Sequence, residues 1–254
     1  MSDTMMHTYW NLPYVLLSIA IAVITSYLGL ELARRFNRIG GSTAAVALGA
    51  VLGYGIWAMH FIGMLAMQLP TNVAYGLPLT LLSGVSAIAF LIVASLVLSR
   101  GQPTIPRILA SGVIAGAGIL LMHYVGMAAI RLNATPSYQA LPFALSVLIA
   151  VGAASAAFFL FSRVMTADLT RSVRTGIQVA AALVMGVAIA GMHYTGMAAV
   201  QYLPSAMNGG TVEGVDPQNL FFLVLGVTLL VFVVTSTFIF IEASTNKPYN
   251  TAGD

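Results

Sequence analysis

Seven long apolar segments constrain this chain of 254 residues more than any other feature. A helix needs roughly 20 consecutive apolar residues to cross the hydrocarbon core of a bilayer. Only 7% of the residues are charged, against about 25% in an ordinary soluble domain. The sequence therefore excludes a soluble monomer and predicts an all-α, polytopic membrane protein. The predicted spans are Leu12–Ala33, Thr43–Met67, Leu77–Leu98, Ile105–Ile130, Leu141–Phe161, Gly176–Val200 and Leu220–Ile241.

Basic residues indicate how these spans are oriented, because Lys and Arg gather in cytoplasmic loops. Nine of the ten cations follow the first, third, fifth or seventh span, and only Arg131 follows the fourth. The sequence thus predicts an N-terminus outside the cell and a C-terminus inside.

One motif occurs three times, as Met-His-aromatic-x-Gly-Met around His60, His123 and His193. The histidines are 63 and 70 residues apart, which is one pair of spans each time, so the copies fall on the second, fourth and sixth spans. From the last inner cation to each His there are 22, 16 and 19 residues. This is a helical rise of roughly 24–33 Å, or about one hydrocarbon thickness. The pattern predicts three parallel two-helix repeats, with the imidazoles in one layer near the outer boundary of the membrane core.

Each motif also places a Met on the same helical face as its His, because residues four apart differ in direction by only about 40°. Ionisable side chains within membrane spans are functional candidates, and three copies at one depth favour a shared site over isolated structural histidines. Gly63, Gly126 and Gly196 follow three residues after each His and are expected to allow close helix contact there. The candidate ligand pairs are His60 with Met64, His123 with Met127 and His193 with Met197.

The side chains of the motif indicate which metal it would bind. Imidazole suits zinc, copper, iron and nickel, whereas the soft thioether of Met favours Cu(I). Since the chain has no Cys, the His and Met pairs predict copper, with zinc and an axially held haem as alternatives. Met59, Met122 and Met192 lie about 100° from the histidines and are candidates for ligands, packing or lipid contact. His7 belongs to a partial copy of the motif before the first span and is a candidate outer ligand.

The third copy reads Met192-His193-Tyr194-Thr195, and nearly the whole chain resembles the MHYT integral membrane sensor domain of bacteria. The resemblance implies a sensor whose motif residues bind copper and, through it, oxygen, carbon monoxide or nitric oxide. Many members continue into cytoplasmic modules that make or degrade cyclic di-GMP. The ligands implied by the resemblance are Met59, His60 and Met64; Met122, His123 and Met127; and Met192, His193 and Met197.

The copies differ from one another after the histidine. The first has Phe61 and Ile62 where the family motif has Tyr and Thr, and the second has Val125 in place of Thr. Tyr124 and Tyr194 are candidates to orient an imidazole by hydrogen bonding, which Phe61 cannot do. A role that requires a hydroxyl in all three repeats is therefore not expected.

The organisation expected from the sequence is a seven-helix sensor domain over residues 1–241 and a cytoplasmic tail over residues 242–254. The tail is a fusion point for an output domain, so the chain itself is not expected to be an enzyme. The expected location is the bacterial inner membrane. The expected partners are the lipid bilayer, a diatomic gas and a cytoplasmic signalling domain in cis or in trans, with no nucleic acid; a homo-oligomer is compatible with the sequence.

Two other functions compete with the sensor. A membrane transporter or channel for the metal would need ligands through the full depth, yet away from the histidine layer the spans offer mainly Ser, Thr and Tyr54. A haem or copper redox protein is the other alternative. A retinal light receptor is excluded because Lys247, the only Lys, lies beyond the last span, and no residues resemble a hydrolase constellation.

The orientation is tested by a reporter fused after Asp254. Since the distribution of cations places the C-terminus inside, the reporter should be active only in the cytoplasm. Activity on the outer side would contradict the orientation and the outer placement of the three histidines.

Overall fold

The computed structural model describes residues 8–34, 41–166, 170–204 and 212–245. It contains seven helices long and apolar enough to cross a membrane, which confirms the predicted spans and makes the chain a multi-pass membrane protein. The helices are α1 (Leu12–Ala33), α3 (Gly41–Ala66), α4 (Leu77–Ser99), α5 (Ile105–Ala128), α6 (Ala140–Thr166), α7 (Arg171–Ala198) and α8 (Pro217–Thr245).

Three helix ends differ from the predicted ones by four or five residues. α6 continues past the predicted end at Phe161 to Thr166. α7 begins at Arg171, before the predicted start at Gly176, because Arg171 to Thr175 form polar helical turns beyond the apolar core. α8 continues past Ile241 to Thr245. The predicted boundary of the cytoplasmic tail therefore lies within this helix.

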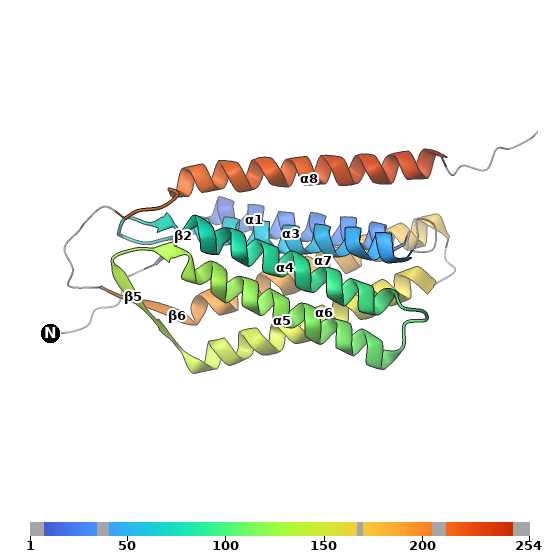
Figure 1. Cartoon of the computed structure of the whole chain (residues 1–254), viewed down its shortest axis with the longest axis horizontal. Helices are drawn as coiled ribbons and strands as arrows, with labels where there is room; N and C mark the ends of the chain where they lie inside the picture. The colour runs from blue at the N-terminus through green and yellow to red at the C-terminus, as the bar shows by residue number, and fades with distance from the viewer. Residues whose placement is uncertain (1–7, 35–40, 167–169, 205–211, 246–254) are drawn as a thin grey trace, which may run out of the picture.

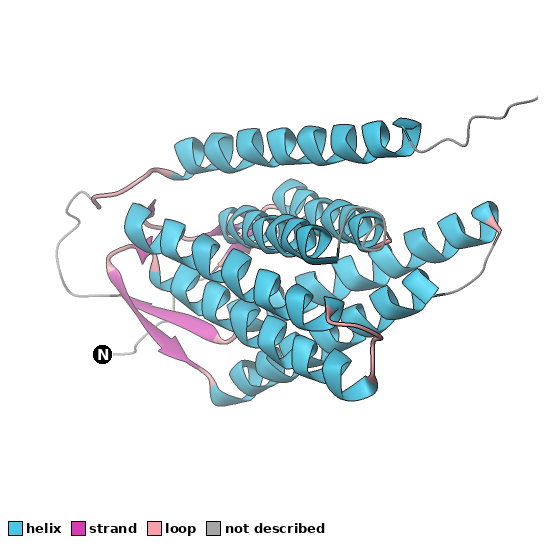
Figure 2. Cartoon of the chain, turned by 45° about the vertical axis from the view of Figure 1, so that its right-hand side comes forward, coloured by secondary structure: helices cyan, strands magenta, loops and turns pink. Residues whose placement is uncertain are grey.

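Three small antiparallel sheets, which the sequence did not predict, gather at one end of the bundle (Figure 2). Each joins the strand before one helix pair to the strand after it, so every repeat has the order strand, helix, helix, strand. Paired strands satisfy backbone groups where the chain leaves the helices. We call this the strand end. The pairs are β1 (Tyr9–Trp10) with β2 (Met67–Gln68), β3 (Ala74–Tyr75) with β4 (Ile130–Arg131), and β5 (Ala134–Tyr138) with β6 (Val200–Pro204).

Six helices, which run lengthwise across Figure 1, contact one another in a closed ring with pseudo-threefold symmetry. The motif-bearing helices α3, α5 and α7 alternate with α1, α4 and α6, and α3 also contacts α5 and α7 across the axis. α8 lies along one side, where it packs mainly on α3 and α1. The parallel repeats predicted from the motif are thus present, and α1 completes the ring by packing against α7.

Glycines allow the helices of the ring to approach closely. At five positions a Cβ in place of the glycine hydrogen would lie less than 3.0 Å from the backbone of the adjacent helix. Only glycine fits there, as in small-residue contacts of other membrane helices. The contacts are Gly49 and Gly53 of α3 on α4, Gly112 and Gly116 of α5 on α6, and Gly186 of α7 on α1.

Candidate metal centre

The three motif histidines meet on the axis of the ring. His60 of α3, His123 of α5 and His193 of α7 all lie in the last turns of their helices, close to the strand end, and each is 0% exposed. Nδ1 of His60 lies 3.0 Å from Nδ1 of His193 and 3.2 Å from Nδ1 of His123. The three side chains each offer a nitrogen within 4.8 Å of the others, so residues far apart in the sequence form one cluster, here called the histidine trio.

Each imidazole lies over the motif glycine of a neighbouring central helix. His60 covers Gly126, His123 covers Gly196 and His193 covers Gly63. A Cβ on these glycines would lie 2.3 to 2.4 Å from the Nε2 atom above it, which no side chain can tolerate. The glycines were expected to bring helices together beside the ligands; instead they make room for the rings, in a cycle that runs once around the axis.

The polar atoms of the trio are suited to a cation. The three Nε2 atoms are buried and have no hydrogen-bond partner, while Nδ1 of His60 lies within hydrogen-bonding distance of the Nδ1 atoms of His193 and His123. A neutral imidazole has one donor and one acceptor nitrogen. When each ring carries its proton on Nε2, three Nδ1 lone pairs converge, and a metal ion between them would replace their repulsion with coordination.

The spacing of the Nδ1 atoms supports this use. Imidazole nitrogens bind zinc at about 2.0–2.1 Å, so two of them on one tetrahedral ion are separated by about 3.3 Å. Two of the three Nδ1 pairs, at 3.0 and 3.2 Å, need little expansion to admit an ion, and the ligand nitrogens of all three histidines lie within 4.8 Å of one another. A haem does not fit the trio, because a porphyrin plane cannot pass between nitrogens this close.

The motif tyrosines do not orient the imidazoles by hydrogen bonding, so this expectation was wrong. The hydroxyl of Tyr124 bonds Ser146 of α6 and that of Tyr194 bonds Ser18 of α1, each at 2.7 Å. The rings of Tyr124 and Tyr194 stand edge-on to their own histidines, with centroids 4.8 Å apart. They position the imidazoles by packing and fasten the central helices to the outer ones.

The first repeat keeps this arrangement without a tyrosine. Phe61 stands edge-on to His60 at 4.9 Å between centroids. Ser83 is the seventh residue of α4, as Ser18 and Ser146 are of α1 and α6, and it accepts a 3.1 Å hydrogen bond from Nε1 of Trp57. Trp57, one turn before Phe61, thus replaces the missing hydroxyl, a substitution that the motif alone does not reveal.

The candidate methionine ligands are all buried. Met64, Met127 and Met197 are 1%, 4% and 2% exposed, and their coordination of a metal stays a prediction. Met59, Met122 and Met192 are buried as well. His7 lies outside the described residues.

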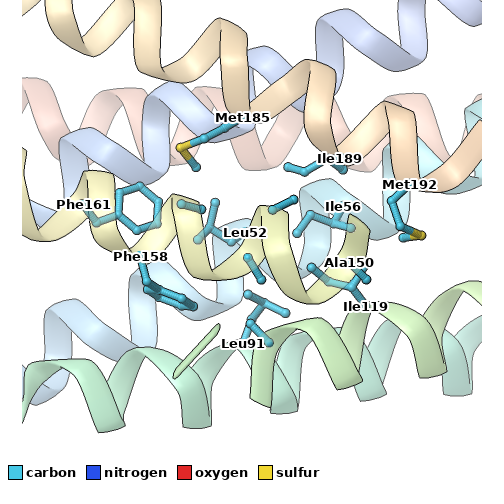
Figure 3. Close-up of a pocket in the computed structure, with 14 residues that line it drawn as sticks. Leu52, Ile56, Leu91, Ile119, Ala150, Phe158, Phe161, Met185, Ile189 and Met192 are labelled. Atoms are coloured by element: carbon cyan, nitrogen blue, oxygen red, sulfur yellow. The ribbon is translucent and has the colours of Figure 1, made fainter. Parts of the chain in front are cut away.

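An apolar cavity of about 40 Å³ lies on the side of the trio away from the strands; its walls include residues one helical turn before each motif histidine but not the histidines themselves. Figure 3 shows Ile56, Ile119 and Ile189 of the central helices around it, with Met192 at one edge, directly before His193. Ala150 and Ala154 of α6 contribute to its wall. A site for one water needs about 10–15 Å³ and several polar partners. This cavity has the room but not the partners, so it suits a small apolar molecule.

Comparison with known proteins places these features among bacterial signalling proteins. The MHYT model, described as a bacterial signalling protein N terminal repeat, matches residues 53–111 and 116–174. The chain is 38% identical over 233 residues to MucR of Pseudomonas aeruginosa, a bifunctional diguanylate cyclase/cyclic di-GMP phosphodiesterase. The matched region covers 91% of this chain and 34% of MucR.

Two further relatives extend the comparison. The signalling protein YkoW of Bacillus subtilis is 31% identical over 247 residues, covering 95% of this chain and 30% of YkoW. The cyclic di-GMP phosphodiesterase NbdA of P. aeruginosa is 40% identical over 195 residues, covering 73% and 24%. The chain therefore spans about a third or less of the length of these curated relatives. No solved structure matches it.

The glycine contacts of the trio generate a prediction. Gly126→Ala or Gly196→Ala should displace His60 or His123 and reduce Cu(I) affinity by about tenfold or more, as for other residues that orient metal ligands. Gly191→Ala is the matched control, because this glycine of α7 has nothing within 4 Å of an added Cβ. Isothermal titration of the purified variants with Cu(I) measures the effect. Wild-type affinity in Gly126→Ala would show that the observed ring positions are not those that bind metal.

Proposed function

We propose, since the chain belongs to the MHYT family of bacterial signalling repeats, that it is a copper-dependent sensor of a diatomic gas or of redox state in the inner membrane. Its signal would reach a cytoplasmic domain, in cis or in trans, that makes or degrades cyclic di-GMP. The family match and the relatives MucR and NbdA support the link to cyclic di-GMP. Catalysis is assigned to that domain and not to this chain.

The histidine trio is the observation that carries the proposal. Three fully buried imidazoles offer a cation a set of closely spaced nitrogen donors. Their Nε2 atoms are buried without a hydrogen-bond partner, which destabilises a fold unless another interaction compensates. His60, His123 and His193 would hold the ion by Nδ1, and a buried motif Met would add a soft ligand that favours Cu(I). Bound copper would supply a redox couple and an attachment point for a gas ligand. Zinc fits the same three nitrogens but supplies no redox couple.

The apolar cavity favours a gas signal and opposes ion transport. A diatomic gas is apolar and small enough for this cavity of about 40 Å³, whose walls include residues one helical turn before the motif histidines. A transported cation would have to cross this apolar region between Ile56, Ile119 and Ile189 without ligands, at a large desolvation cost. The geometry therefore favours sensing over transport.

Helix contacts indicate how a change at the trio would reach the opposite end. Among the central helices, α3 makes the main contact with α8, and the hydroxyl of Tyr54 donates to the Val224 carbonyl at 3.2 Å and lies 3.3 Å from the Thr228 hydroxyl. Tyr54 lies six residues before His60 on α3. A displacement of His60 along or around α3 would thus be transmitted to α8, whose C-terminal end lies away from the strands.

A second contact holds the far end of α7. Arg34 and Glu31 of α1 form an ion pair at 2.8 Å, and both bond the side-chain amide of Gln178 on α7, at 2.9 and 2.8 Å. This junction fastens α7 to α1 while α3 remains connected to α8. Movement of α3 relative to α7 is therefore the expected form of the signal, a discrete repacking of helices.

Metal analysis tests the chemistry. Purified protein should bind copper, and His60→Ala, His123→Ala and His193→Ala should each lower the bound copper, because each removes one of three converging donors. Met64→Leu, Met127→Leu and Met197→Leu should weaken Cu(I) binding more than Cu(II) binding, following ligand softness. Met185→Leu, a substitution in the cavity wall, is the control. Full copper content in the triple histidine variant would contradict the proposal; equal effects of the Met variants on both oxidation states would show that these residues only pack.

The signalling route is tested in a fusion of the C-terminal tail to a cyclic di-GMP enzyme. Output should respond to copper and to a change in oxygen or nitric oxide, and Tyr54→Phe should reduce the response without changing copper content, because it removes the bond to α8. Ser86→Ala removes a hydroxyl that bonds within α4 and should respond like the wild type. An output that never responds to metal or gas would refute the sensor; a normal response in Tyr54→Phe would refute this route alone.

A further inference from the structure

Each histidine of the trio begins a row of aromatic rings that runs toward the strand end. In the third repeat, His193 and Tyr194 have centroids 4.8 Å apart, and Tyr194 meets Trp10 of β1 at 5.5 Å. In the second repeat, His123 and Tyr124 are also 4.8 Å apart, and Tyr124 meets Tyr138 of β5 at 6.1 Å. These separations are those of aromatic pairs in contact.

The two rows connect the most buried side chains of the protein with its surface. The histidines are 0% exposed, whereas Trp10 is 45% and Tyr138 47% exposed. Because the chain has no Cys, Trp and Tyr are its side chains most readily oxidised by one electron. Both rows therefore consist of a possible metal ligand followed by two oxidisable rings, the last of which is exposed in a strand beyond the membrane-spanning helices.

The first repeat has a corresponding row of rings, but the ring beside its histidine is not readily oxidised. Phe61 follows His60 and meets Tyr75 of β3 at 6.2 Å. Phenylalanine is not oxidised under conditions that oxidise tyrosine, and Tyr75 is only 3% exposed. Burial also raises the pKa of Tyr75, which keeps it a neutral phenol. The protein thus contains two complete rows and one natural control.

We infer that the pair Trp10 and Tyr194 and the pair Tyr138 and Tyr124 are electron conduits. Through them, charged radicals in the outer aqueous phase, acting as one-electron oxidants, oxidise a metal held by the trio. Such oxidants cannot reach the trio themselves, because its residues have no exposed surface. The inference rests on the proposed function in requiring a redox-active metal, but the conduits are testable without one.

The electron balance is simple. An oxidant at the strand end takes one electron from Trp10 or Tyr138 and is reduced. Tyr194 or Tyr124 supplies the missing electron, and a Cu(I) ion held by the trio would in turn supply one electron to that tyrosine. The phenol protons of Tyr194 and Tyr124 stay in their hydrogen bonds to Ser18 and Ser146, whose own protons are donated to backbone carbonyls. All aromatic residues end as they began, and no covalent bond in the protein changes.

The test uses the full chain in detergent, loaded with Cu(I) and mixed with photogenerated tris(bipyridine)ruthenium(III), which is charged and strongly oxidising. Cu(II) formation is followed by electron paramagnetic resonance. We expect rapid Cu(II) formation in the wild type, partial loss in Trp10→Phe and in Tyr138→Phe, and loss of most of the signal in the double variant. Phenylalanine keeps a ring in each position but is not oxidised. Tyr75→Phe is the matched control and should behave like the wild type.

A second measurement separates this inference from the proposed function. In metal-free protein with ring-deuterated tyrosine, the same flash should leave its radical on Trp10 and Tyr138, which are exposed and can release a proton to solvent, and the double variant should not form it. If the protein binds no copper, the proposed function fails while this radical still supports Trp10 and Tyr138 as the entry points of the conduits. The inference is overturned if the double variant forms Cu(II) or the radical as the wild type does, or if Tyr75→Phe slows oxidation as much as Trp10→Phe.

Discussion

The packing of three imidazoles on one axis is the constraint on which the rest of the structure depends. A ring can lie there only where the facing helix has no side chain, and Gly63, Gly126 and Gly196 provide that space. Each histidine therefore fixes the position of the next helix, and the three contacts close on themselves. The small-residue contacts of the outer helices complete this arrangement, because they hold the ring of six tightly enough for the Nδ1 atoms to meet.

Threefold symmetry also explains which departures the protein tolerates. The packing of an aromatic ring against each histidine is kept in all repeats, whether the ring is Tyr or Phe. The hydrogen bond to the outer helix is kept too, by a tyrosine in two repeats and by Trp57 in the first. What the first repeat loses is the oxidisable ring beside its histidine. A structural role thus accounts for what is common to the repeats, and an electron-transfer role accounts for what differs.

Sequence reasoning identified the helices and the trio because both depend on simple counting. The span beginning at Leu12 and ending at Ala33 was predicted to the residue, and similar distances from the inner cations, of 22, 16 and 19 residues, placed the histidines at one depth. The sheets were missed because their strands are short and pair across whole helix hairpins, such as Ala74 with Arg131. The partners of Tyr194 and Gly126 were missed for a related reason, since helical periodicity gives the direction of a side chain but not the identity of the helix it faces.

Nitrogen-15 magnetic resonance of histidine-labelled protein loaded with diamagnetic Cu(I) tests the claim that three Nδ1 atoms bind one metal. The structure predicts that metal addition shifts Nδ1 of His60, His123 and His193 together, while their Nε2 atoms stay protonated over Gly126, Gly196 and Gly63. Coordination through Nε2, or unchanged Nδ1 resonances in protein that contains copper, would contradict it.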